Sequence, residues 1–147
     1  MIAVTEITRT PDVATYTADA VALLVYLVDS LPDRADRAFA EAEAGESVIQ
    51  APSTALAEVI YAVSRDKTVR GVRLAGTPGE TRQALLSNGP VSTAPVAEAE
   101  LAEYVEVVEE FNIHDGLIVA SHYAQGTDAV ISSDAAIQDA GVATIWN

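Results

Sequence analysis

The segment Val13–Leu27 reads VATYTADAVALLVYL, and its pattern decides the fold class. The first six residues alternate and are rich in β-forming side chains, which predicts a strand over Val13–Ala18. Asp19 follows, and the apolar run after it predicts a helix over Ala20–Asp29 that ends at Ser30-Leu31-Pro32. A strand that leads through one acid into an apolar helix is typical of an α/β protein with a parallel sheet.

The same alternation of strands and helices continues to the end of the chain. Further strands are predicted over Ser47–Gln50, Val91–Thr93, Asp128–Ser132 and Val142–Trp146. Further helices are predicted from Asp33 to about Ala44, from an N-cap at Ser53, and over Glu80–Leu86, Val96–Phe111, Asn112–Ala124 and Asp134–Ala140. We therefore expect a three-layer α/β/α sandwich with a mostly parallel central sheet. The length of 147 residues suits one domain, with residues 1–12 as an extended lead-in.

The polar segment Arg65–Glu80 has the weakest pattern in the chain. We expect a helical stretch followed by a loop at Gly76–Gly79. The segment holds four of the eight basic residues, which we call the basic cluster: Arg65, Lys67, Arg70 and Arg73. We expect these side chains either to contact RNA or an acidic partner segment, or to form a solvated face paired with nearby acids.

The charge balance is strongly acidic, with 22 Asp and Glu against 8 Lys and Arg and a formal charge of -14. This balance argues against broad electrostatic binding of nucleic acid at low salt. The dense carboxylates resemble the surfaces of cytoplasmic proteins from salt-accumulating archaea, and a mesophilic acidic domain is the alternative. The glutamates expected on solvent faces are Glu41, Glu43, Glu46, Glu98, Glu100, Glu103, Glu106, Glu109 and Glu110.

The composition also excludes several classes of protein. There is no cysteine, which rules out disulfides, thiolate metal sites and a cysteine nucleophile, and fits a cytoplasmic protein. No apolar run reaches the length of a membrane span, since the run at Val21–Val28 is short. The N-terminus lacks the basic region of a secretion signal.

Four acids lie in the most apolar segments of the chain: Asp19, Glu58, Asp115 and Asp134. Each has a plain structural explanation, because Asp19 and Asp134 can cap helices and Asp115 suits a helix N-terminus. Glu58 can occupy a wet stripe of its helix. A charge buried without a partner is costly, however, so an acid in so apolar a helix suggests a nearby cation. Asp19 and Asp134 also follow predicted strands, and parallel sheets place their sites at such ends.

These acids lie in stretches that resemble the motifs of the PIN-domain family in order, spacing and flanking residues. The stretches are Asp19–Leu27 (DAVALLVYL), Ala51–Ile60 (APSTALAEVI), Phe111–Ala120 (FNIHDGLIVA) and Val130–Asp134 (VISSD). The resemblance runs from about Val13 to Asn147. The chain departs from the family at Val21, where a small polar residue is usual, and at Ser132, where threonine is common but a hydroxyl is kept.

The resemblance implies a ribonuclease that depends on Mg²⁺ or Mn²⁺. Asp19 and Asp134 would be the central ligands, Asp115 and Glu58 would bind directly or through water, and Ser132 would support them. Cleavage would leave a 5′-phosphate and a 3′-hydroxyl. Short PIN proteins mostly resemble VapC-type toxins, which implies an RNA substrate, a homodimer and a cognate antitoxin.

Two other functions remain open from the sequence. A PIN-like protein that has lost activity could serve as a binding module, and Val21 keeps that alternative in view. A phosphoacceptor receiver domain also gathers acids at strand ends, but it needs a lysine late in the chain, and the only lysine here is Lys67. His114 and His122 are expected to be ordinary helix residues, because neither has partners at zinc-ligand spacing.

Overall fold

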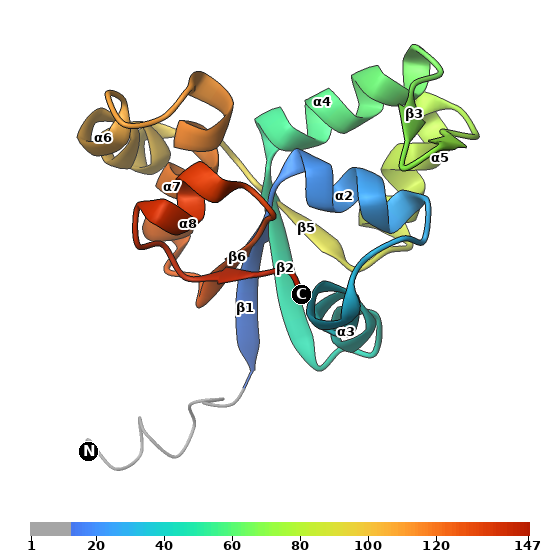
Figure 1. Cartoon of the computed structure of the whole chain (residues 1–147), viewed down its shortest axis with the longest axis horizontal. Coiled ribbons are helices and arrows are strands. Elements are labelled where there is room, and N and C mark those ends of the chain that lie inside the picture. Colours follow the sequence, from blue (N-terminus) through green and yellow to red (C-terminus); the bar gives the residue numbers. More distant parts are fainter. Residues whose placement is uncertain (1–12) are drawn as a thin grey trace.

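A parallel sheet forms the centre of the molecule in the computed structural model, which describes residues 13–147 (Figure 1). The predicted lead-in, residues 1–12, lies outside the described residues. Five parallel strands pair in the order β5-β2-β1-β6-β7. Their bounds are Ala14–Ala18 for β1, Ser47–Pro52 for β2, Val91–Ala94 for β5, Ala129–Ile131 for β6 and Thr144–Ile145 for β7. The predicted parallel sheet is confirmed.

Helices cover both faces of this sheet, which confirms the three-layer arrangement. On one side lie α2 (Ala20–Leu27), α3 (Asp33–Glu43), α4 (Ser53–Ser64) and α5 (Pro78–Arg82) (Figure 1). On the other side lie α6 (Glu98–Val107), α7 (Ile113–Gln125) and α8 (Ala135–Asp139). No helix within residues 13–147 is long and apolar enough to cross a membrane.

The core divides into clusters on the two faces of the sheet. Neighbouring residues of β6 show the division, because Ile131 packs with Leu23 and Phe39 while Val130 packs with Ile118 and Ile137. Successive side chains of a strand point to opposite faces. A strand covered by helices on both sides must therefore be apolar at every position, which explains the unbroken apolar run of β6.

The connections leave β1 and β6 in opposite directions. The chain passes from β1 to β2 and then β5, whereas it passes from β6 to β7 on the other side of the sheet. Because β1 and β6 are neighbours, the loops at their carboxyl ends diverge, and this is where α/β folds form a binding crevice. The two strands stay joined at this end, where the Asp19 N–H donates to the Ile131 carbonyl at 3.3 Å.

The segment after α4 differs from the prediction. A short antiparallel hairpin, β3 (Thr68–Val69) and β4 (Val72–Arg73), replaces the expected helical stretch. Its two turn residues have positive φ, 53° at Arg70 and 77° at Gly71, as a tight hairpin turn requires. The prediction was wrong because arginine is an unusual first residue for such a turn and the strands are too short to show alternation.

Three helix starts also differ from the prediction. The loop expected at Gly76–Gly79 ends early, because α5 begins at Pro78 behind a capping box formed by Thr77 and Glu80, and it continues as a π-helical turn, η1 (Gln83–Ser87). Ser53 and Asp33 were expected to cap helices. Each is instead the first helical residue after a proline, and neither cap position makes a side-chain hydrogen bond.

The apolar stripe of α6 and its C-cap consists of Leu101, Tyr104, Val105 and Val108, and three of these side chains are exposed. Leu101, Val105 and Val108 are exposed by 51%, 68% and 41%. Glu100, expected on a solvent face, is instead buried. Its carboxylate accepts hydrogen bonds from the Ala97 N–H at 3.1 Å and Gln125 Nε2 at 2.6 Å. These hydrogen bonds give the buried Glu100 carboxylate partners on the side of α6 that contacts α7. The apolar stripe therefore lies on the solvent side of α6.

Candidate active site

Asp19 and Asp134 occupy equivalent positions at the ends of neighbouring strands. Asp19 caps α2, and its Oδ1 accepts from the Ala22 N–H at 2.8 Å. Asp134 caps α8, and its Oδ1 accepts from the N–H groups of Ala136 at 2.8 Å and Ile137 at 3.3 Å. In each carboxylate these cap bonds use Oδ1 and leave Oδ2 for other partners. The capping role expected for both acids therefore coexists with a place in the crevice.

Asp115 reaches the same crevice from α7. Asn112 caps this helix, with its Oδ1 accepting from the Asp115 N–H at 2.8 Å, and its Nδ2 donates to Asp115 Oδ2 at 3.1 Å. This pair of bonds fixes the first turn of α7 and the orientation of the acid. A carboxylate in the first turn is also favoured by the helix dipole.

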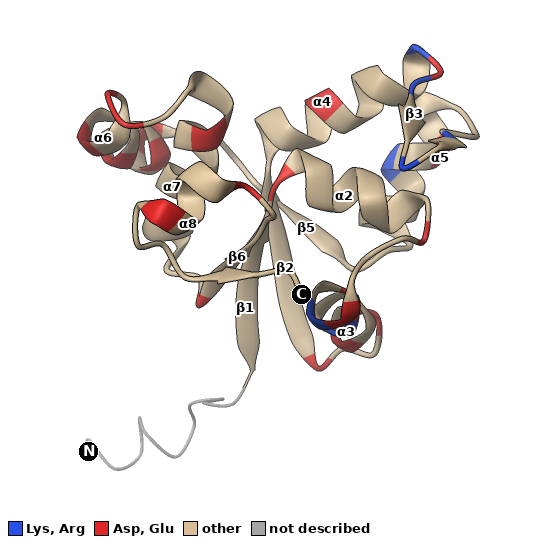
Figure 2. Cartoon of the chain, in the orientation of Figure 1, with Lys and Arg blue, Asp and Glu red and all other residues tan. Residues whose placement is uncertain are grey.

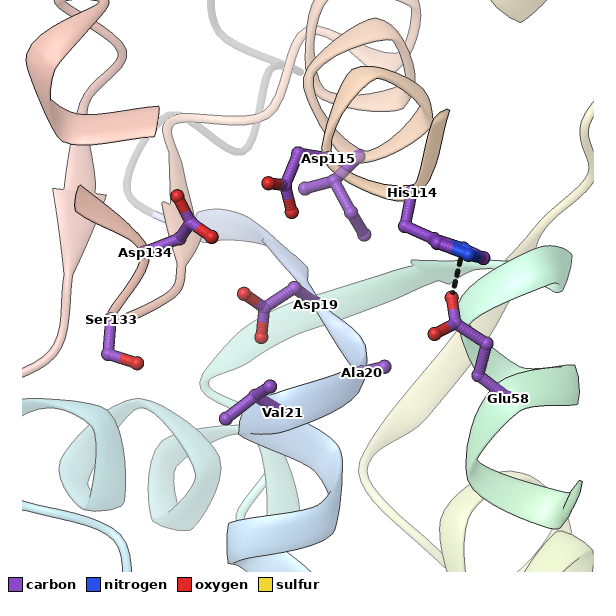
Figure 3. Close-up of a pocket in the computed structure, with 9 residues that line it drawn as sticks. Asp19, Ala20, Val21, Glu58, His114, Asp115, Ser133 and Asp134 are labelled. Atoms are coloured by element: carbon purple, nitrogen blue, oxygen red, sulfur yellow. Dashed lines mark ion pairs between the residues drawn. The ribbon is translucent and has the colours of Figure 1, made fainter. Parts of the chain in front are cut away.

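The three aspartates converge in what we call the acid pocket, a cavity of about 130 Å³ at the carboxyl ends of β1 and β6. Figure 3 shows their carboxyl groups turned toward one another. Burial, with smaller contributions from Asp115 and Asp134, raises the pKa of Asp19 to about 6 despite hydrogen bonds from Ser132 and Ala22. Burial and the adjacent Asp134 carboxyl also raise the pKa of Asp115. The cluster therefore carries negative charge that lacks compensation.

Glu58 lines the acid pocket but stands apart from the aspartates. Its Oε1 lies 2.9 Å from His114 Nδ1, and the two side chains are 41% and 61% exposed (Figure 3). Of the two alternatives for Glu58, the solvent-facing stripe of its helix is the one observed, because α4 turns this position toward the rim of the pocket. His114 was expected to be an ordinary helix residue, whereas it is the partner of Glu58.

Ser132 connects two of the aspartates from beneath. It is fully buried, its Oγ accepts from the Asp134 N–H at 3.0 Å, and its hydroxyl is hydrogen-bonded to the Asp19 side chain. One hydroxyl thus links the carboxylate of Asp19 to the backbone of Asp134. His122, the other histidine, is buried on α7 with Nδ1 2.8 Å from Thr127 Oγ1, a structural contact.

The basic cluster lies far from the acid pocket. Its residues follow the end of α4, a helix of 12 residues that extends about 18 Å, whereas Glu58 lies in the first half of that helix. Figure 2 shows these cations around the β3–β4 hairpin and the acidic residues of the pocket near the centre of the molecule. Arg73 pairs with Asp66 at 3.2 Å, and Arg65 lies over the ring of Tyr61.

The acid pocket offers oxygen donors, which suit a hard divalent cation. Within residues 13–147, no three His, Asp or Glu side chains are already placed to hold one ion together. Mg²⁺ keeps several water ligands and needs only one or two carboxylates. The pocket, with three converging carboxyl groups and uncompensated negative charge, fits an ion held in this way.

Comparison with known proteins gives the fold. No family model matches the sequence, and comparison with curated proteins found no relative. Two solved structures are similar: VapBC2 from Rickettsia felis bound to a DNA fragment from its promoter, and VapC20 from Mycobacterium tuberculosis, a toxin that cleaves the sarcin-ricin loop. Their sequences are 17% and 15% identical to this chain and their TM-scores are 0.67 and 0.61. Each match covers 90% of this chain and 99% of the other.

The chain has the VapC-like PIN fold. Within this PIN fold, sequence reasoning gave no role to five residues that line the pocket: Ala20, Val21, His114, Ile118 and Ser133. His114 and Ser133 each directly precede one of the predicted acids, so their positions in the sequence were the available signal. Val21 is 48% exposed and forms an apolar part of the pocket wall where the family usually has a small polar side chain.

Proposed function

We propose that this protein is an endoribonuclease that depends on Mg²⁺ or Mn²⁺ and hydrolyses RNA phosphodiesters at the acid pocket. The observation that carries the proposal is the convergence of Asp19, Asp115 and Asp134 at the point where the connections of β1 and β6 diverge. Three carboxyl groups in one small cavity favour a cation, and the PIN fold supports the assignment to RNA cleavage.

Each residue of the acid pocket has a distinct part in this proposal. Asp19 and Asp134 hold the metal through the oxygens that their helix caps leave free, and Asp115 holds it directly or through water. A bound ion would activate a water molecule for attack and neutralise charge that develops on the phosphate. Glu58, fixed by His114, orients or deprotonates the attacking water from the rim. Ser132 holds Asp19 and Asp134 in position relative to each other.

The biological role we propose is that of the toxin in a toxin–antitoxin pair. Structures of a VapBC assembly and of a VapC toxin share the fold, which supports an antitoxin partner and RNA as the substrate. We further propose a homodimer, a cytoplasmic location and a salt-rich archaeal source. The exposed apolar stripe of α6 supports a protein partner, and the formal charge of -14 supports adaptation to salt.

The decisive experiment measures cleavage of RNA with Mg²⁺ or Mn²⁺ at high KCl. Asp19→Asn and Asp134→Asn should each reduce the cleavage rate on the order of 100-fold or more. The loss of one charged metal ligand weakens stabilisation of the transition state by several kcal/mol. Asparagine also caps helices, so both variants should stay folded. Asp139→Asn, which removes the same charge from the exposed surface of α8, is the matched control and should cleave normally.

One observation favours a second function, that of an inactive binding module. Val21 places an apolar side chain in the wall of the acid pocket. Wild-type protein that binds Mn²⁺ with an affinity lowered by Asp19→Asn, yet cleaves no RNA, would contradict the nuclease proposal and support the module. The experiment therefore needs a metal-binding titration beside the cleavage assay.

A further inference from the structure

A second polar pocket lies on the side of the sheet that carries α3. Its volume is about 190 Å³, and its lining residues are Tyr16, Arg34, Arg37, Ala38, Glu41 and Ile145. We call it the α3 pocket. It shares no lining residue with the acid pocket, and two of its six lining side chains are arginines in a chain that has 8 basic residues and 22 acids. Figure 2 shows the cations of α3 apart from those around the hairpin.

The two arginines are arranged to bind together. Arg34 and Arg37 are three residues apart on α3, so their side chains lie on one face of the helix. The ion pairs found within residues 13–147 join Arg73 to Asp66 and His114 to Glu58, so neither α3 arginine is neutralised in that part of the chain. No ion pair within residues 13–147 therefore competes with a ligand for either guanidinium group.

The walls of the α3 pocket are fixed by the sheet and by the end of the chain. Tyr16 belongs to the central strand β1, and Ile145 belongs to β7. The Ala35 N–H donates to the Trp146 carbonyl at 3.0 Å, which ties α3 to the segment after β7. Ala38, which is buried, leaves room between the two arginines and the sheet. These contacts fix the backbone of α3 beside the sheet, and the exposed side chains of Arg34 and Arg37 line the cavity from that helix.

Tyr16 adds a hydrogen-bond donor to the two cations. Burial and the carboxylates of Glu41 and Asp128 raise the pKa of its hydroxyl, while Arg34 acts in the opposite direction. The hydroxyl is therefore protonated at neutral pH and can donate. Glu41 is the one acid in the lining, so the six lining residues carry two positive charges and one negative charge.

We propose that the α3 pocket binds a phosphate group through Arg34, Arg37 and the Tyr16 hydroxyl. Guanidinium groups recognise phosphate by paired, charge-assisted hydrogen bonds, which two adjacent arginines can supply together. We take this phosphate to belong to the backbone of bound RNA, outside the cleavage site. Only this identification of the ligand as RNA rests on the proposed function. A free phosphate or a mononucleotide offers the same chemistry.

The position of the α3 pocket relative to the acid pocket supports RNA as the carrier. Ala18, Ile131 and Ile145 lie in register across β1, β6 and β7, so Ile145 is level with the residue before Asp19. Tyr16 precedes Asp19 by three residues, about 10 Å along the strand. A strand of a few nucleotides could contact both pockets. In an acidic protein, such a site would attract the backbone locally where the overall charge repels it.

The test measures binding in EDTA, so that no metal at the acid pocket contributes. The full chain is titrated with a labelled single-stranded oligoribonucleotide, and with inorganic phosphate and AMP as competitors, at the lowest KCl at which it stays folded. Trp146, the only tryptophan, directly follows Ile145 and gives a fluorescence signal from beside the pocket. The double variant Arg34→Gln/Arg37→Gln should weaken oligonucleotide binding about 10-fold or more.

Matched variants separate a built pocket from bulk charge. Arg82→Gln removes a positive charge from the exposed surface of α5, outside the lining and outside the basic cluster, and should weaken binding less than about 2-fold, whereas Arg34→Gln alone should weaken it more. Tyr16→Phe should weaken binding about 3-fold, and Glu41→Gln should strengthen it, whereas Glu46→Gln, an exposed acid outside the lining, should not. Equal losses in Arg34→Gln and Arg82→Gln, or no loss in the α3 double variant, would overturn the proposal.

The competitors identify the carrier. Oligonucleotide binding that tightens with length and resists millimolar phosphate would support RNA. If phosphate and AMP displace the oligonucleotide equally well, the pocket binds a small phosphate ligand. That result would contradict the proposal that RNA contacts both pockets. Because binding is measured without metal, a protein that binds here but never cleaves RNA would keep the phosphate pocket while the proposed nuclease function fails.

Discussion

At the scale of single residues, the acid pocket depends on aspartates that each serve two purposes. Asp19, Asp115 and Asp134 all take part in helix starts, as expected for acids at these positions, and all three also face one cavity. The sequence indicated this gathering because the acids follow strands or begin apolar helices. It could not separate Glu58 from them, because the His114 contact depends on how α4 and α7 lie relative to one another.

The raised pKa of Asp19 makes stability depend on pH in the metal-free protein. The folded state holds this proton up to about pH 6, whereas an ordinary value is 3.8, so stability falls as pH rises between these values. The full effect is about 3 kcal/mol at most. In EDTA, Asp19→Asn should therefore unfold at a higher temperature than wild type at pH 7.5, and the difference should shrink by pH 4.

Thermal unfolding followed by circular dichroism measures this difference. Adding Mn²⁺ at pH 7.5 should stabilise wild type and leave Asp19→Asn nearly unchanged, because the ion neutralises the buried negative charge that only wild type carries at Asp19. An advantage of Asp19→Asn that is equal at both pH values would show that the buried charge is not its source.

At the scale of elements, long and strongly patterned segments were predictable and short ones were not. The strands and helices from β1 to β2, and α7 with its Gly126 stop, lie within a few residues of their predicted bounds. The β3–β4 hairpin escaped prediction because two-residue strands carry no alternation. The periodicity of α6 indicates an apolar face but does not say what covers it, and in the structure this face is exposed.

The contact between α6 and α7 depends on Gly116. A Cβ at this position would lie 2.8 Å from Tyr104 Cε1 and 3.7 Å from Phe111 Cβ. Gly116→Ala should therefore destabilise the fold by about 1–2 kcal/mol, since the displacement of Tyr104 outweighs the gain of about 1 kcal/mol in helix propensity. Because Asp115 is adjacent, the variant should also bind Mn²⁺ more weakly.

Gly79→Ala is the matched control for this prediction. Gly79 lies in α5, and a Cβ there would meet nothing closer than Thr77 Oγ1 at 4.0 Å. Chemical denaturation should show this variant to be as stable as wild type or more so. If Gly116→Ala were also neutral, Tyr104 must move without loss, and the close packing of the two helices would not be needed.

At the scale of the whole molecule, surface charge sets the conditions under which the fold is stable. The charge of -14 is spread over exposed glutamates, six of which are Glu43, Glu46, Glu98, Glu106, Glu109 and Glu110. Repulsion among them acts over a Debye length of about 10 Å at 0.1 M salt and about 3 Å at 1 M. The sequence predicted this surface directly, whereas the order β5-β2-β1-β6-β7 arises from long-range pairing that no local pattern contains.

Screening of this repulsion should stabilise the protein. The midpoint of thermal unfolding should rise by about 5 °C or more between 0.1 and 2 M KCl, which corresponds to 1–2 kcal/mol for a chain of this size. The triple variant Glu106→Gln/Glu109→Gln/Glu110→Gln should be more stable at low KCl and respond less to added salt. A salt response identical to that of wild type would mean that these acids on and after α6 are not its source.

The helix caps at Asp19 and Asp134 have one more consequence, for how such a protein could change over generations. Each carboxylate gives one oxygen to a helix start and leaves the other for the pocket. Asparagine can still cap the helix but cannot supply a negatively charged metal ligand. A change of one base converts an aspartate codon into an asparagine codon. A descendant could therefore lose its chemistry and keep its architecture and partners in a single mutational step. Under the proposed function, such inactive copies would arise readily and could still occupy an antitoxin without cleaving RNA.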